Sequence, residues 1–126
     1  MKYVVVVSLV LAGIIHLLPL SGALGTSRLA HLYGIAIEDP NLALLMRHRA
    51  VLFGLLGVFL IYAAFCPPMQ VPGFIAGLVS VVAFLLLAWS TGHLNAPLGR
   101  VVIVDVVAAV ALILGACARW WLASTS

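Results

Sequence analysis

The sequence predicts an all-α fold: an integral membrane, up-and-down four-helix bundle with a short interfacial helix between the first two spans. Composition is the first observation, because 66% of the 126 residues are hydrophobic and only 7% are charged, whereas an average soluble domain carries about 25% charged residues. The second observation is four apolar stretches, at residues 2–24, 41–66, 71–93 and 99–122, each near the ~20 residues that cross a bilayer as a helix. These spans fill nearly the whole chain, so residues 1–126 are expected to form a single transmembrane domain.

The first span, residues 2–24, has a basic start and a long apolar run, which are also features of a signal peptide. We interpret it as a membrane span, because the apolar run is longer than a typical signal core and contains His16. The connection GTSRLAHLYGIAIEDP follows. Apolar residues recur at helical spacing within residues 27–33, which predicts a short helix lying in the membrane interface.

The second span opens with IEDPN, in which Asp39 or Asn41 is expected to cap the helix and Pro40 to lie in its first turn. Two tight turns, CPPMQVP and HLNAPLG, separate the last three spans. Such short connections force consecutive helices to run antiparallel. The end of the first span, the start of the second, the end of the third and the start of the fourth therefore lie on one side of the membrane.

Small residues predict the faces on which the helices meet, because membrane helices pack through close approach of their backbones. Gly54 and Gly57 lie on such a face of the second span, and Gly73 and Gly77 on a face of the third. Extending the first of these stripes towards the N-terminus brings Arg47 onto it. The pattern therefore predicts that Arg47 points towards the other helices.

The segment MRHR places two arginines inside an otherwise apolar helix. Arg49 points about 160° away from Arg47, so Arg49 is expected to extend to the lipid headgroups. Counting ~1.5 Å per residue from the membrane edge places His16, Arg47, His48 and Asp105 at a similar depth. Asp105 is the carboxylate expected within a helix at that level, which predicts an Arg47–Asp105 pair with both histidines close to its hydrogen bonds.

Two interpretations of this polar cluster are open. A buried ion pair can fix helix register without any chemistry, or the cluster can line a cavity that binds a polar or anionic head, since ionisable groups inside a membrane are candidate functional sites. The second interpretation predicts binding or transport of an amphipathic small molecule that is quinone-, isoprenoid- or lipid-like. The expected ligand-binding residues are His16, Arg47, His48, Asp105, Trp89 and Tyr33.

Two other function classes stay open. One is a redox membrane subunit that uses quinone or a b-type haem, for which His16 and His48 would be the ligands. The other is an accessory subunit of a larger membrane complex without its own chemistry. No Walker, HExxH or GxSxG motif is present, so no catalytic residue is assigned and a binding protein is favoured over an enzyme.

The spacing of the cysteines and the distribution of charge argue against two classes of binding partner. Cys66 and Cys117 are too far apart in sequence for a CxxC or zinc motif, so no metal site is expected. The basic residues are scattered, which argues against nucleic-acid binding. The expected partners are membrane lipid, an amphipathic ligand, and a second copy of the chain or a larger membrane complex.

The segments HLLPLSGALG, LYGIAIEDPN and MRHRAVLFGLLGVFLIYAAF, followed by two further apolar helices, resemble the small bacterial four-helix membrane proteins of DoxX-like type and related families of unknown function. The resemblance implies a multi-pass protein of the bacterial inner (cytoplasmic) membrane. Some DoxX-like members are associated with quinone-linked sulfur oxidation, and many have no assigned activity. The basic MKY start favours termini in the cytoplasm, whereas the balance of Lys and Arg at the span ends favours the reverse.

Overall fold

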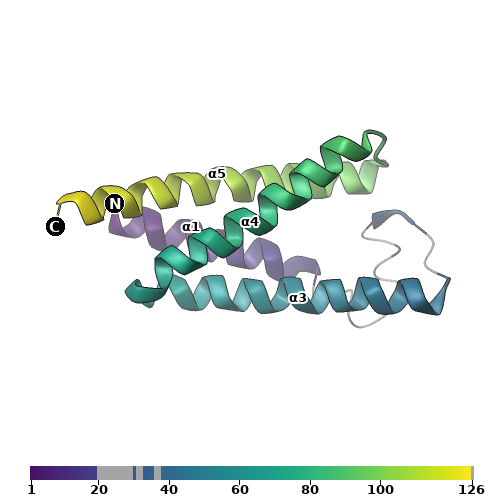
Figure 1. The fold of residues 1–126 in the computed structure, drawn as a ribbon, viewed down its shortest axis with the longest axis horizontal. Helices are drawn as coiled ribbons and strands as arrows, with labels where there is room; N and C mark the ends of the chain where they lie inside the picture. The colour runs from purple at the N-terminus through teal and green to yellow at the C-terminus, as the bar shows by residue number, and fades with distance from the viewer. Residues whose placement is uncertain (20–29, 31–32, 36–37, 126) are drawn as a thin grey trace.

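The computed structural model describes residues 1–19, 30, 33–35 and 38–125, and this part of the chain is helical (Figure 1). Its elements are α1 (Lys2–Leu17), α3 (Pro40–Ala64), α4 (Pro67–Thr91) and α5 (Ala96–Thr125). The predicted all-α architecture is confirmed, and α3, α4 and α5 are long and apolar enough to cross a membrane, while α1 is a shorter apolar helix. Most of the predicted interfacial helix at residues 27–33 lies outside the described residues, as does the end of the first predicted span.

Helix starts follow from local chemistry. Asp39 caps α3, because its Oδ1 accepts a hydrogen bond of 2.8 Å from the backbone N–H of Asn41, and Pro40 occupies the first turn as predicted. α4 begins earlier than the sequence suggested. Pro67 and Pro68 are its first residues, where a missing backbone N–H costs no intrahelical hydrogen bond.

The four helices close into a ring in the order α1, α3, α4, α5, with neighbours antiparallel (Figure 1). α1 packs against both α3 and α5, and α4 packs against the same two helices, running obliquely across them. Within the described residues, the backbones of α3 and α5 do not approach each other closely. The centre of the ring between α3 and α5 is therefore filled by side chains rather than by direct helix contact.

α1 and α3 approach at the level of their backbones. A Cβ built on Gly57 would lie 2.6 Å from the carbonyl oxygen of Gly13, and a Cβ built on Gly13 would lie 2.8 Å from the carbonyl oxygen of Gly57. Gly54 is buried one turn away. Such contacts are typical of membrane helices, which gain stability from close packing.

Two glycines of α4 allow this helix to pack closely against its neighbours. A Cβ on Gly73 would lie 2.9 Å from Cβ of Ala63, and a Cβ on Gly77 would lie 3.1 Å from Cδ1 of Leu112. Glycine at these positions therefore lets α4 lie against α3 and α5 together. The fully buried Leu60 and Leu112 fill the space beside Gly77.

The main apolar core lies along α1, and a smaller one lies beyond it. Leu9 is fully buried at the centre of the main core. α1 has only 16 residues, against 30 in α5, so it ends well before the Pro40 end of α3. At that end a second cluster forms around the buried ring of Tyr33, with Met46 and Val101 packed against it. The candidate site lies between these two cores.

Candidate functional site

A cavity of about 260 Å³ lies where α1 ends, between α3 and α5. Its walls combine ionisable or aromatic side chains with an apolar majority. The polar and aromatic lining consists of His16, Tyr33, Arg49, Phe53, Arg100 and Asp105, and the apolar lining of Ile15, Leu18, Pro19, Pro97, Val101 and Val104. The cavity is therefore an amphipathic site built from three helices and the segment that carries Tyr33.

Arg49 is the cation at the centre of this site. Its Cζ lies 4.5 Å from the ring centre of Phe53, 5.2 Å from that of Tyr33 and 5.7 Å from that of Phe84 on α4. One guanidinium N–H also donates a hydrogen bond to the hydroxyl of Tyr33. Cation–π contacts are worth about 2 kcal/mol or more once the cation is desolvated. The aromatic rings therefore provide a local reason for a half-buried arginine in an apolar helix.

His16 is a buried histidine with one satisfied ring nitrogen. Its Nδ1 lies 2.7 Å from the carbonyl oxygen of Ala12, and because a carbonyl can only accept, Nδ1 carries the proton. The imidazole stacks on Phe53 with ring centres 5.5 Å apart. Nε2 is buried and has no hydrogen-bond partner in the described part of the chain. In the neutral imidazole, that nitrogen is an acceptor.

Asp105 is the carboxyl group of the site. It lies on α5 and only 7% of it is exposed. The groups that act on it electrostatically are His16 and Arg49, yet within the described residues neither forms a direct ion pair with it. A buried carboxylate without a paired charge is costly. Asp105 and Arg49 thus face one cavity and leave space between them.

Tyr33 is held over the cavity by the start of α5. Asn95 caps α5, because its Oδ1 accepts a hydrogen bond of 2.8 Å from the N–H of Leu98. Its side-chain amide donates to the carbonyl oxygens of Tyr33 at 2.9 Å and Gly34 at 3.2 Å. Gly34 adopts a φ of +67°, and a Cβ there would lie 2.8 Å from Pro97. One amide therefore joins the helix start to the segment that positions the phenol.

The structure brings together half of the side chains predicted to bind a ligand. His16, Tyr33 and Asp105 line the cavity. Arg47 and His48 are exposed, and Trp89 is 85% exposed. These three residues do not line the cavity, so the structure does not bring them to the same site as the other three.

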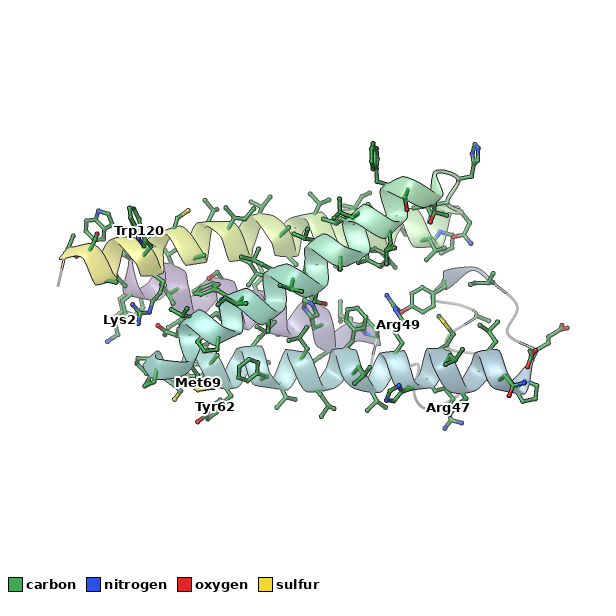
Figure 2. The ribbon with its side chains drawn as sticks, in the orientation of Figure 1. Lys2, Arg47, Arg49, Tyr62, Met69 and Trp120 are labelled. Carbon is green, nitrogen blue, oxygen red and sulfur yellow. The ribbon has the colours of Figure 1, made fainter. Side chains whose placement is uncertain are left out.

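The predicted orientations of the two arginines are reversed. Figure 2 shows Arg49 pointing into the molecule and Arg47 pointing away from it. A Cβ on Gly57 would touch Leu17, the last residue of α1. Arg47 lies ten residues earlier, about 15 Å further along α3. The glycine stripe faces α1, but α1 ends at Leu17, before the level of Arg47, and no other helix of the described residues lies opposite that face of α3.

A second stripe of α3 faces the interior and carries the site. Arg49, Phe53, Leu56 and Leu60 follow each other at helical spacing, and Leu60 reaches the glycines of α4. The spacing of these larger side chains could therefore have predicted which face of α3 points to the interior. Arg100, at the start of α5, also lines the cavity and was not among the predicted ligand-binding residues.

The geometry does not favour a haem held by two histidines. His16 faces the cavity, whereas His48 is exposed on α3, so the predicted ligand pair does not converge. Among the described residues, no group of three or more His, Cys, Asp or Glu side chains could hold a metal ion. The site is instead suited to a polar organic head that accepts from Arg49 and donates to Asp105.

Comparison of the chain with protein-family models, with curated proteins and with solved structures finds no match.

Proposed function

We propose that the protein is a multi-pass membrane protein whose cavity binds the head of an amphipathic small molecule. Three helices have the length and apolar character to cross a bilayer. Large apolar side chains also cover the outside, among them Leu55, Val79 and Leu87, each at least 60% exposed. An apolar surface on this scale is unfavourable in water and suited to lipid. A bacterial inner-membrane location and a DoxX-like relationship form part of this proposal.

One observation carries the binding proposal: Arg49 and Asp105 face the same cavity without touching. An ion pair that only fixed helix register would be in direct contact, because close contact is what offsets the cost of burying two charges. On insertion scales a charge at the centre of a membrane helix costs about 2.5–3.5 kcal/mol. The aromatic rings offset this cost for Arg49, whereas Asp105 has no such partner among the described residues. A ligand between them would stabilise both charges.

The side chains that line the first cavity indicate which class of ligand it would bind. Arg49 and Arg100 provide hydrogen-bond donors, and Asp105 accepts. The head should therefore carry an acceptor or a negative charge on one side and an O–H or N–H group on the other. A volume of about 260 Å³ is near the lower end of the ~300–1,000 Å³ of small-molecule sites. The cavity fits a head, and an apolar tail would extend along its apolar wall, to which Leu18, Val101 and Val104 belong.

The test is to identify what remains bound after purification. The protein is purified from membranes in a mild detergent and extracted with organic solvent, and the extract is analysed by mass spectrometry. Wild type should retain a specific amphipathic molecule, and Asp105→Asn and Arg49→Gln should lose it. Arg47→Gln is the matched control, since it removes the same charge from an exposed position of the same helix.

Each other result has a defined meaning. A quinone in the extract, with a matching absorption change on reduction, would assign the site to redox chemistry. A stoichiometric membrane protein in place of a small molecule would identify an accessory subunit. Identical bulk lipid in all four preparations, each of them monodisperse, would contradict the binding proposal.

A further inference from the structure

A second cavity, of about 510 Å³, lies at the opposite end of the molecule. It is formed by the start of α1, the turn between α3 and α4, and the last turns of α5. Its polar residues are Lys2, Gln70 and Arg119, and Val5, Phe65 and Leu122 belong to its apolar wall. Figure 2 shows Lys2 at this end, far from Arg49. This cavity shares no residue with the site that contains Asp105.

The second cavity is cationic and has no acidic side chain nearby. The three carboxylate side chains of the sequence are Glu38, Asp39 and Asp105. The first two precede α3, whose 25 residues place them about 37 Å from its other end. Asp105 lines the first cavity. The charges of Lys2 and Arg119 are therefore not balanced by an acidic side chain in this part of the molecule.

Helix ends of both polarities meet at this cavity, because the starts of α1 and α4 and the ends of α3 and α5 contribute to it. The start of α1 contributes Lys2 and Val5 to the cavity. The first turn of α1 contains no acidic residue, and Met1 makes no side-chain cap hydrogen bond. The N-terminal N–H groups of a helix carry partial positive charge and are typical binding groups for anions.

Two buried polar groups show that the cavity is more than a patch of surface lysine and arginine. Nε of Arg119 is buried without a hydrogen-bond partner in the described residues. Gln70 is 8% exposed, and its side-chain amide donates to the carbonyl oxygen of Ala64 at 3.2 Å. A guanidinium has a planar set of donors that matches the oxygens of a phosphate. Arg119 thus presents an unused donor where an oxyanion would be stabilised.

We infer that this second cavity binds a phosphate group, carried by the head of an anionic phospholipid. Arg119 and Lys2 contact the phosphate oxygens, while Val5, Phe65 and Leu122 pack against the first carbons of the acyl chains. The combination of cations at the edge and apolar residues beside them matches an amphipathic anion better than a free ion. The inference is independent of the proposed function of the first cavity, which lies at the other end of the bundle.

The experiment measures thermal stability in detergent with three additives: phosphatidylglycerol, phosphatidylcholine with the same acyl chains, and inorganic phosphate. Phosphatidylglycerol should stabilise wild type more than phosphatidylcholine does. Arg119→Gln and Lys2→Gln should each weaken its apparent affinity roughly tenfold, as expected for loss of a charge-assisted hydrogen bond. Arg47→Gln removes a charge from an exposed position that lines neither cavity, so it is the control for charge and should leave the lipid effect unchanged.

The additives also distinguish the source of the phosphate. Protection by phosphatidylglycerol alone supports the lipid head, and equal protection by inorganic phosphate supports a free phosphate at the same residues. Equal protection by both lipids would overturn the inference. So would a phosphatidylglycerol effect that persists in both variants. If Arg119→Gln does not fold, Lys2→Gln and Lys2→Glu still test the site, because Lys2 is exposed.

Discussion

Replacing Gly57 with alanine tests the contact that sets the position of α1 against α3. The new Cβ would lie 2.6 Å from the carbonyl oxygen of Gly13 and 2.9 Å from Cγ of Leu17. An ordinary van der Waals contact begins near 3.4 Å, so the two backbones must separate by about 0.8 Å at this point. No side-chain rotation relieves a clash with a carbonyl oxygen. The helices themselves must move.

Gly99 offers a matched control in α5, because nothing lies within 4 Å of a Cβ built on it. Gly→Ala in a helix gains about 1 kcal/mol from propensity at either position. Overpacking costs about 1–3 kcal/mol and applies only to Gly57. The free energies of unfolding of the two variants should therefore differ by about 1–3 kcal/mol, with Gly57→Ala the less stable.

The assay is reversible unfolding in mixed micelles, followed by circular dichroism as the fraction of denaturing detergent is raised. Gly57→Ala should also retain less ligand in the first cavity, because Leu17 is the neighbour of His16, which stacks on Phe53. Equal stability of the Gly57 and Gly99 variants would refute the assigned contact. A destabilised Gly57→Ala that still retained wild-type amounts of ligand would separate the contact from the site.

Two further predictions concern the ends of the helices near the site. Asn95→Ala removes the cap of α5 and the hydrogen bonds to Tyr33 and Gly34. It should lower the free energy of unfolding by about 1–2 kcal/mol and speed proteolysis near Tyr33. A wild-type rate of proteolysis would show that Asn95 does not hold this segment. Asp39→Ala removes only the cap of α3 and should cost about 1 kcal/mol without changing ligand retention, so a lost ligand would show that Asp39 acts on the cavity.

Hydropathy and capping patterns were sufficient to predict that α1, α3, α4 and α5 are helices, because both depend on local sequence. Depth was also predictable for part of the site. Since the rise per residue is constant and neighbouring helices run antiparallel, His16 and Asp105 could be placed at one level, and both line the cavity. The direction in which a side chain points was predictable only where a neighbouring helix was present along the whole stripe.

Arg47 and Trp89 show why direction was harder to predict than depth. The stripe that contains Arg47 faces α1 only as far as the level of Leu17, and the end of α1 is not marked by a change in hydropathy. Trp89 follows Gly77 by twelve residues, a rotation of about 120° away from the packed face of α4. Phe84 follows Gly77 by seven residues and returns to nearly the same face, in agreement with its contact to Arg49.

Because α1 is much shorter than α5, dense packing and an open cavity lie at different levels of the molecule. The dense packing around Leu9, Leu60 and Leu112 lies along α1, whereas the cavity lies at its last turn, which contributes Ile15 and His16. Residues that confer rigidity are therefore different from residues that would confer selectivity. Changes at Val101 or Val104 would reshape the cavity while leaving the central leucine layer intact, so under the proposed binding function ligand preference could change without loss of the fold.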